Sequence, residues 1–209
     1  MRKVPDTLGR RERAKEDKRR RILAAASELF AARGVGGVTT QQIADRADVA
    51  VGTLFLYAST KAELLIMVQN EKFAAAIELG LTAEAVAERS GATREEEVLA
   101  LIRPVVACIR DQLENGRTYL HELIFGDPSE PHRREGLTLS AKLEGGIART
   151  LTREERMSTA TAATLARVIT AIIHVSTTAT IHAHRTTTEV VDDIGAQIHA
   201  ILLSQTPGA

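Results

Sequence analysis

The sequence is poor in the residues that mark several common classes of protein. Its 209 residues include one cysteine, five prolines, no tryptophan and only 3% aromatic residues. The single cysteine, Cys108, excludes a disulfide framework. No run of about 18 apolar residues is present to span a membrane, and the charged N-terminus lacks the apolar segment of a secretory signal. We therefore expect a cytoplasmic protein that does not contact a membrane.

The residues that are abundant favour helices. Hydrophobic residues make up 44% of the chain, and with so few aromatic residues the core must be built from Leu, Ile, Val and Ala. Long stretches rich in Ala, Leu, Glu and Arg favour helix over strand. We predict an all-α protein, organised as one large domain or two small ones.

The formal net charge is zero, but the charge is unevenly distributed. Residues 1–61 contain 13 basic and 7 acidic residues, a net charge of +6, so the remaining 148 residues carry −6. A basic N-terminal part on an acidic body is typical of a protein that binds phosphates at one end.

The chain begins with a charged segment and a long helix. Residues 1–14 are expected to form a flexible basic arm, which either has no role or touches DNA. The first helix should run from about Lys15 to Arg33, because Gly34 suits the position that follows a helix end.

Residues 38–61 have the pattern of a helix-turn-helix. Thr39 and Gln42 have the spacing of a capping box, which predicts a short helix that begins at Thr39. Asp48 lies in the turn that follows, where Asp tolerates a left-handed backbone better than most residues. A further helix is expected over about 50–57.

That further helix has the features of a recognition helix that enters the major groove of DNA. Its first residues are all small, which lets a helix approach the base edges closely; they are Ala50, Val51, Gly52 and Thr53. Leu54 should point inward, whereas Leu56 and Tyr57 should lie on the outer side.

Phosphates need hydrogen-bond donors beside such a helix. Thr39 and Thr40 lie at a helix N-terminus, where free N–H groups and the helix dipole favour an anion. Lys61 begins the next helix, where a positive charge costs a few tenths to roughly 1 kcal/mol unless an anion docks there. The predicted DNA-binding residues are Thr39, Thr40, Gln42, Ala50, Val51, Gly52, Thr53, Leu56, Tyr57 and Lys61.

These residues resemble the DNA-binding domain of the TetR family of transcriptional repressors. The matching residues are Arg33, Gly34, Thr39, Thr40, Ile43, Ala44, Ala47, Asp48, Val49, Gly52, Thr53, Leu54, Phe55, Tyr57, Lys61, Leu64 and Leu65. The resemblance implies about nine helices. A three-helix DNA-binding domain would occupy 15–61, and a six-helix ligand-binding and dimerisation domain would occupy 62–209.

Four positions depart from the family pattern. Asp48 replaces the usual glycine of the turn, and Leu56 stands where a polar or aromatic residue is common. Ala58 and Ser59 replace the usual aromatic residue and the usual Pro or Gly. Leu56 predicts a contact with a thymine methyl group rather than a hydrogen bond. On this interpretation phosphate contacts supply most of the affinity, and few base hydrogen bonds supply specificity.

Caps and turns predict the remaining helices. They are expected over about 60–89, 93–114 with Pro104 inside, 117–125 after a turn at Asn115 and Gly116, 132–151, 152–184 opened by Thr152 and Glu155, and 186–204. The last two are apolar on one face and rich in small residues, which favours a four-helix interface between two subunits over packing within one subunit. We expect a homodimer on a pseudo-palindromic double-stranded DNA operator, with half-sites about 34–36 Å apart or a multiple of that.

The family resemblance also implies an effector pocket in the second domain. The candidate lining residues are Leu101, Arg103, Val105, Cys108, Tyr119, Leu123, Phe125, Leu143, Ile147 and His174. Most of them equally suit an ordinary core, and their aliphatic character indicates a small apolar effector. His174 and His182 are too far apart along a helix to chelate one metal, so we expect no metal and no cofactor.

The sequence therefore predicts a ligand-responsive transcriptional regulator, a repressor that a small apolar molecule releases from its operator. One alternative is a helical adaptor that binds protein and not DNA, but the net charge of +6 over residues 1–61 argues against it. The other is an enzyme centred on Cys108. The chain offers no nucleophile elbow, glycine-rich phosphate loop or metal-ligand spacing, so we expect no enzymatic activity.

Overall fold

The computed structural model describes residues 7–127, 129–153 and 157–203. Within these ranges every regular element is a helix, which confirms the predicted fold class. The chain divides into two compact units, Met1–Val68 and Gln69–Ala209.

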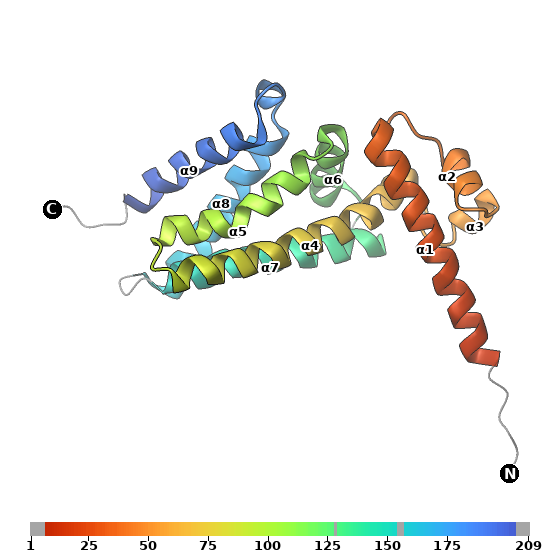
Figure 1. Ribbon diagram of the computed structural model, residues 1–209, viewed down its shortest axis with the longest axis horizontal. Coiled ribbons are helices and arrows are strands. Elements are labelled where there is room, and N and C mark those ends of the chain that lie inside the picture. The colour runs from red at the N-terminus through yellow and green to blue at the C-terminus, as the bar shows by residue number, and fades with distance from the viewer. Residues whose placement is uncertain (1–6, 128, 154–156, 204–209) are drawn as a thin grey trace, which may run out of the picture. The chain divides into compact units, whose positions relative to one another are not determined.

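The first unit is built from three helices and the start of a fourth. These are α1 (Thr7–Arg33), α2 (Thr40–Arg46), α3 (Val51–Leu54) and α4 (Lys61–Arg89), whose first two turns belong to this unit. The N-terminal half of α1 extends past α2 and α3 (Figure 1). The core of the unit is aliphatic apart from one aromatic ring, and its largest members are Ile22, Phe30, Ile43, Leu54, Leu64, Leu65 and Met67.

The boundary between the units lies later than the sequence predicted. We expected the DNA-binding domain to end at Lys61, but the first unit continues to Val68. The reason is packing, because Leu64, Leu65 and Val68 on α4 are at most 3% exposed and belong to the core of the first unit. The helix that enters the second unit is thus anchored in the first.

The expected flexible arm is also different in the structure. Helix α1 begins at Thr7, so residues 7–14 are helical, and residues 1–6 lie outside the described ranges. The Arg13 side chain donates its Nε–H to the Gly9 carbonyl at 3.1 Å, one turn back. Arg, Lys and Glu also have good helix propensity, so this polar segment continues the helix that follows it.

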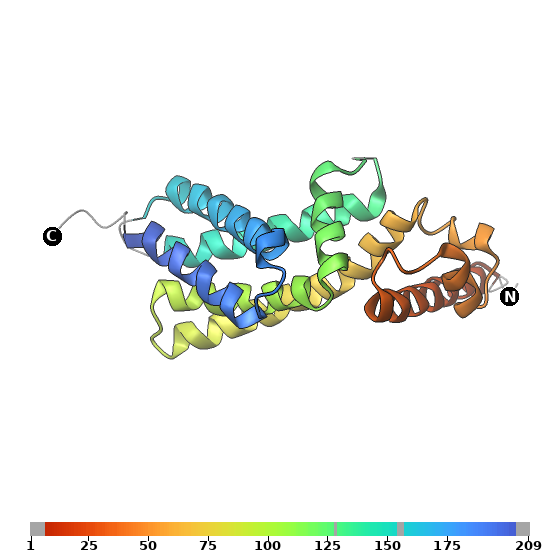
Figure 2. The ribbon, with the colours of Figure 1, turned by 90° about the horizontal axis from the view of Figure 1, so that it is seen from above.

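The second unit contains the rest of α4 and five further helices. They are α5 (Arg94–Arg110), α6 (Leu113–Phe125), α7 (Pro131–Thr152), α8 (Thr159–Thr178) and α9 (Thr187–Leu203), with a short 3₁₀ turn, η1 (Thr180–His182), after α8. Helix α7 packs against α5 and α8, and α9 packs on α5 and α8. Figure 1 shows α5 between α9 above it and α4 and α7 below it, and Figure 2 shows the same helices from above.

The predicted turn at Asn115 and Gly116 is wrong. Both residues are buried inside the first turns of α6, and the break falls earlier, at Gln112. The Gln112 side chain accepts the Asn115 N–H at 2.8 Å and so caps α6. Gly116 is required by close packing instead, because a Cβ there would lie 1.9 Å from the Ile109 carbonyl oxygen.

The helix expected over 152–184 is shorter at both ends. Helix α8 begins after Ser158, whose hydroxyl accepts the Thr161 N–H at 3.1 Å; Thr152 ends α7, and Glu155 lies outside the described ranges. Its C-terminus is fixed by Arg117, which donates to the Thr178 and Ala179 carbonyls at 2.8 and 3.2 Å. These guanidinium donors satisfy carbonyls that a helix end leaves free, so the helix stops there.

Two other predicted caps are confirmed. Thr93 and Glu96 form a full capping box at the start of α5. Thr186 and Glu189 form the same reciprocal pair before α9, with N–H···O distances of 2.7 and 3.2 Å.

Helix α8 is also the one described helix whose length and composition would allow it to cross a membrane. It carries a single Arg, Arg167, among Ala, Thr, Ile and Val residues. A single helix of this kind is weak evidence for a membrane protein, because core helices pass the same test. Here Ala162, Ala166 and Ile169 are fully buried in the core of the second unit.

Candidate DNA-binding site

The capping box at the start of α2 fixes the helix-turn-helix. Thr39 Oγ1 accepts the Gln42 N–H at 3.2 Å, and Gln42 Oε1 accepts the Thr39 N–H at 3.0 Å, as the spacing predicted. After α2, Asp48 has φ of 53°, the left-handed conformation expected for the turn. The Val49 N–H then donates to the Ala44 carbonyl at 3.0 Å and closes the turn.

Helix α1 holds this turn in a way that the sequence did not reveal. The Arg21 guanidinium donates to the Ala47 and Asp48 carbonyls at 2.9 and 3.2 Å. Arg46 of α2 forms a two-pronged ion pair with Glu28 of α1 at 2.8 Å. From the sequence, Arg21 and Arg46 contributed only to the net positive charge. Their partners lie 18 to 27 positions away along the chain, so no local sequence pattern indicates these contacts.

The recognition segment is short and turns its small residues outward. Regular helix covers only Val51–Leu54, although hydrogen-bonded turns continue to Ala58. Leu54 is fully buried and Ala58 is 3% exposed, so a small residue fills the place where the family has an aromatic ring. Ala50 and Gly52 are exposed and Thr53 is half-buried, whereas the half-buried Val51 packs against the core of the unit.

Two large apolar side chains extend this exposed surface. Leu56 is 82% exposed and Phe55 is 43% exposed. Exposing Leu56 forgoes about 1.5–3 kcal/mol of burial free energy, and no described residue of the first unit covers it. The exposed residues around α3 therefore present methyl groups and bare backbone rather than hydrogen-bonding side chains.

Lys61 lies beside the start of α2. Its Nζ donates to the Val38 carbonyl at 3.1 Å, immediately before the Thr39 cap. An ammonium group has three donors, so this bond leaves two of them for an anion. Thr39 is exposed and Thr40 is half-buried at the same end of α2, so the structure brings these three predicted phosphate contacts together.

Tyr57 has a different environment from the one we predicted. Its hydroxyl donates to the Lys15 carbonyl of α1 at 3.0 Å. The phenolic proton is therefore used within the domain and is not available to a phosphate. Tyr57 instead ties the end of the recognition segment to α1.

The candidate effector residues all lie in the second unit, but they do not form one group. Six are at most 3% exposed: Leu101, Val105, Tyr119, Leu123, Leu143 and Ile147. Cys108 and His174 are half-buried. Arg103 is exposed on α5, and Phe125 is 72% exposed at the end of α6. Arg103 and Phe125 therefore do not line the interior.

Of the buried candidates, Tyr119 belongs to a polar network at the start of the second unit. The Tyr119 hydroxyl donates to Asn70 Oδ1 at 2.9 Å, and Asn70 Nδ2 donates to the His132 carbonyl at 2.8 Å. Burial raises the pKa of the Tyr119 hydroxyl and raises the pKa of the Cys108 thiol to about 11. Burial also lowers the pKa of His174, so these three groups are neutral near pH 7.

The described residues contain no group of three or more His, Cys, Asp and Glu side chains that could hold a metal ion. Several ionisable side chains of the second unit form ion pairs with one another. Arg153 of the α7 end joins Glu84 at 2.5 Å and Glu97 at 3.3 Å.

The fold and the candidate site define an all-helical protein with an N-terminal helix-turn-helix. Residues 22–68 match the family described as bacterial regulatory proteins, tetR family. A 60-residue segment is 40% identical to the HTH-type transcriptional repressor KstR of Mycobacterium tuberculosis, covering 29% of this chain and 27% of that protein. KstR of Rhodococcus jostii matches equally well over 60 residues, or 28% of its length.

Solved structures extend the likeness to the whole fold. Thermus thermophilus FadR, solved with lauroyl-CoA, aligns over 91% of this chain and 96% of its own, with a TM-score of 0.67 and 22% identity. Bacillus subtilis FadR, solved with stearoyl-CoA, aligns over 85% and 96%, with a TM-score of 0.58 and 18% identity.

Residues 22–68 of the chain are thus similar to the TetR family. Sequence identity supports this within the first unit, and the curated relatives are matched over less than a third of their length. The matched family and relatives are described as regulatory proteins and transcriptional repressors.

Proposed function

We propose that this protein is a transcriptional repressor that binds double-stranded DNA as a homodimer and is released by a small amphipathic molecule. One observation carries the DNA-binding part of the proposal. An exposed surface of short side chains around Gly52 lies on the most basic part of the chain, within the same unit as the partly free ammonium group of Lys61. Such a function belongs in the cytoplasm, where chromosomal DNA lies.

The surface around α3 favours recognition by close approach. Ala50 and Gly52 let the helix enter the major groove deeply, and Thr53 offers a hydroxyl for a base edge. The exposed Leu56 methyl groups fit a thymine methyl group. Lys61, Thr39 and Thr40 would hold the phosphates and set the register of the helix.

Exposed faces of α8 and α9 support the dimer. On α8, Thr164, Val168, Ala171 and Val175 are all exposed at steps of three or four residues. Val175 is 63% exposed and Val168 is 40% exposed, and an open groove lined by Ala160, Thr161, Thr164 and Leu165 continues this face. On α9, Ala196, Ala200 and Leu203 repeat the pattern. A second copy of α8 and α9 would cover both faces in a four-helix interface.

The interior of the second unit supports an effector with an apolar tail. Its candidate lining is aliphatic apart from Tyr119, and Cys108 and His174 are uncharged there. The two FadR neighbours were solved with acyl-CoA molecules, which consist of a long apolar chain on a charged carrier. A long-chain acyl-CoA is therefore the effector class to test first.

Fluorescence anisotropy tests the proposal. A labelled duplex from the DNA upstream of the gene should bind purified protein with an affinity that falls steeply with salt, and lauroyl-CoA should release it whereas free coenzyme A should not. No binding at any salt would contradict the repressor. Binding that no acyl-CoA of any chain length weakens would remove the effector class and leave the repressor in place.

A second experiment addresses the dimer. Val168→Arg with Val175→Arg should convert the protein to a monomer in light scattering, because two buried charges at an apolar interface are strongly unfavourable. Val86→Arg on α4, where Val86 is 53% exposed, is the matched control and should leave the dimer intact. A double variant that stays dimeric would show that this face is not the interface.

A further inference from the structure

The N-terminal half of α1 carries basic residues on the face that is apolar in its C-terminal half. Arg11, Lys15 and Lys18 precede Ile22 at steps of three or four residues, so they lie in the same row along the helix. Ile22 is fully buried and Phe30, further along the row, is 1% exposed, whereas the three basic residues are exposed. We call Arg11, Lys15 and Lys18 the α1 basic stripe.

The position of this stripe is fixed relative to the helix-turn-helix. Tyr57 donates its hydroxyl proton to the Lys15 carbonyl, and Arg21 donates to the Ala47 carbonyl of the turn. These two anchors hold α1 beside the end of the recognition segment and beside the turn. From Lys15 back to Thr7 the helix continues for about 12 Å, at 1.5 Å per residue, beyond the last anchor (Figure 1).

The acidic residues of α1 that form ion pairs serve other arginines. Glu16 pairs with Arg19, and Asp17 pairs with Arg20 and Arg21. The first turn of α1 contains no acidic residue. Within the described residues the stripe thus forms no ion pair, so its three positive charges remain for an external anion.

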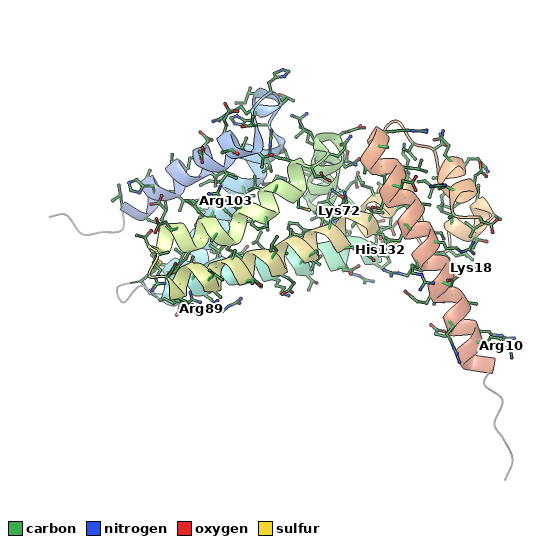
Figure 3. The ribbon with its side chains drawn as sticks, in the orientation of Figure 1. Arg10, Lys18, Lys72, Arg89, Arg103 and His132 are labelled. Atoms are coloured by element: carbon green, nitrogen blue, oxygen red, sulfur yellow. The ribbon has the colours of Figure 1, made fainter. Side chains whose placement is uncertain are left out.

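We propose that the α1 basic stripe binds the phosphate backbone of DNA that flanks the half-site read by α3. This inference rests on the proposed DNA-binding function and adds a second contact region to it. Charge complementarity and continuity with the helix-turn-helix both favour DNA as the occupant. Arg10 borders the stripe, and Figure 3 shows Arg10 and Lys18 projecting from this half of α1.

The helix reaches far enough for several phosphates. Duplex DNA carries one charge per about 1.7 Å of its axis, so a 12 Å helical extension passes several phosphates on the two strands. Three stripe residues that each neutralise one phosphate would add about 2.7 to the slope of log K against log salt for each bound protomer. The effect should be the same for every flanking sequence, because phosphates carry no sequence information.

The test compares two triple variants of the full-length protein on two duplexes. Arg11→Gln, Lys15→Gln and Lys18→Gln together remove the stripe and keep helix propensity. Arg89→Gln, Arg134→Gln and Arg149→Gln remove the same charge from exposed positions of the second unit. Each protein is titrated against the operator with ten flanking base pairs on each side and against the operator trimmed to its half-sites, at several salt concentrations.

The stripe variant should lose about 2.7 units of salt slope per protomer on the long duplex, whereas the control variant should keep the parent slope. Trimming should remove the difference between the stripe variant and the parent protein. Equal slopes on the long duplex would overturn the proposal, as would equal differences on both duplexes. A stripe variant that loses binding to vesicles containing phosphatidylserine but keeps its slope on DNA would overturn it in favour of a membrane.

Failure of the proposed function itself gives a different result. In that case the parent protein binds neither duplex, so no slope of log K against log salt can be measured for it. Circular dichroism separates a folding defect from a lost contact. We expect the parent protein and the stripe variant to have the same helix content and the same melting temperature. If the variant loses helix content together with its salt slope, the lost slope reflects a folding defect, and this would count against a direct contact with DNA.

Discussion

Replacing Gly52 by Ala should raise stability and weaken DNA binding at the same time. Gly52 lies in the first turn of α3, is exposed, and has no atom within 4 Å of the position that a Cβ would take. Its φ is not in the left-handed region, so alanine fits without strain. The substitution should therefore stabilise the free protein by about 0.4–1 kcal/mol, because alanine restricts the unfolded chain.

The same methyl group should obstruct the DNA. If Gly52 meets base edges in the major groove, a Cβ there forces the helix outward, and overpacking of this kind typically costs about 1–3 kcal/mol. That corresponds to about a five- to 150-fold weaker complex at 25 °C. Urea denaturation measures the first effect, and anisotropy with the operator duplex measures the second.

Gly145→Ala is the matched control. Gly145 lies inside α7 in the second unit, and a Cβ there would meet only the flexible Arg149 guanidinium at 3.5 Å. This variant should gain stability by a similar amount and keep the parent DNA affinity. The reasoning is refuted if Gly52→Ala binds DNA as tightly as the parent protein, or if both variants weaken binding equally.

Three further outcomes follow from single contacts. Lys61→Ala should weaken binding to all sequences alike and lower the salt slope by about one unit per protomer, whereas Arg89→Ala should not; loss of sequence preference alone would contradict a phosphate contact. Tyr119→Phe should lower the free energy of unfolding by about 1–3 kcal/mol, because Asn70 Oδ1 loses its buried donor, and an unchanged urea midpoint would exclude this. Alkylation of Cys108, whose pKa is about 11, should stay slow at neutral pH and rise about tenfold per pH unit in alkaline buffer; fast labelling near pH 7 would contradict its burial.

Local signals predicted the helix starts well. Thr39 with Gln42, Thr93 with Glu96 and Thr186 with Glu189 all form the caps that their spacing indicates. Each signal lies within four residues and depends on backbone geometry that a short peptide can adopt. The left-handed turn at Asp48 belongs to the same class of prediction.

Helix ends that depend on distant contacts could not be predicted in this way. The end of α8 is set by Arg117 from another helix. Gly116 indicated a turn, yet it is the close approach of the Ile109 backbone that requires glycine. Arg117 lies about 60 positions before the carbonyls that it binds, and the Ile109 backbone approaches Gly116 from the preceding helix. Neither contact leaves a pattern in the neighbouring sequence.

The candidate DNA-binding site also combines features that the local sequence predicts with features that depend on distant contacts. Its residue types and exposed positions around Gly52 follow from the sequence. The bonds that set its geometry, from Lys61 to Val38 and from Tyr57 to Lys15, join residues 23 and 42 positions apart. The second of these makes Tyr57, which the sequence placed among the DNA-binding residues, an anchor of α1.

The central claim, that this is a sequence-specific dimeric DNA-binding protein, is tested most directly by sequencing the DNA that it selects. Purified protein would be incubated with a random duplex library, and the bound fraction sequenced after several rounds. We expect an inverted repeat whose half-sites are separated by one helical turn, about 34–36 Å, or a multiple of it, and Gly52→Ala should lose this enrichment. Recovery of no sequence above the starting library, or of a single half-site without symmetry, would contradict the account.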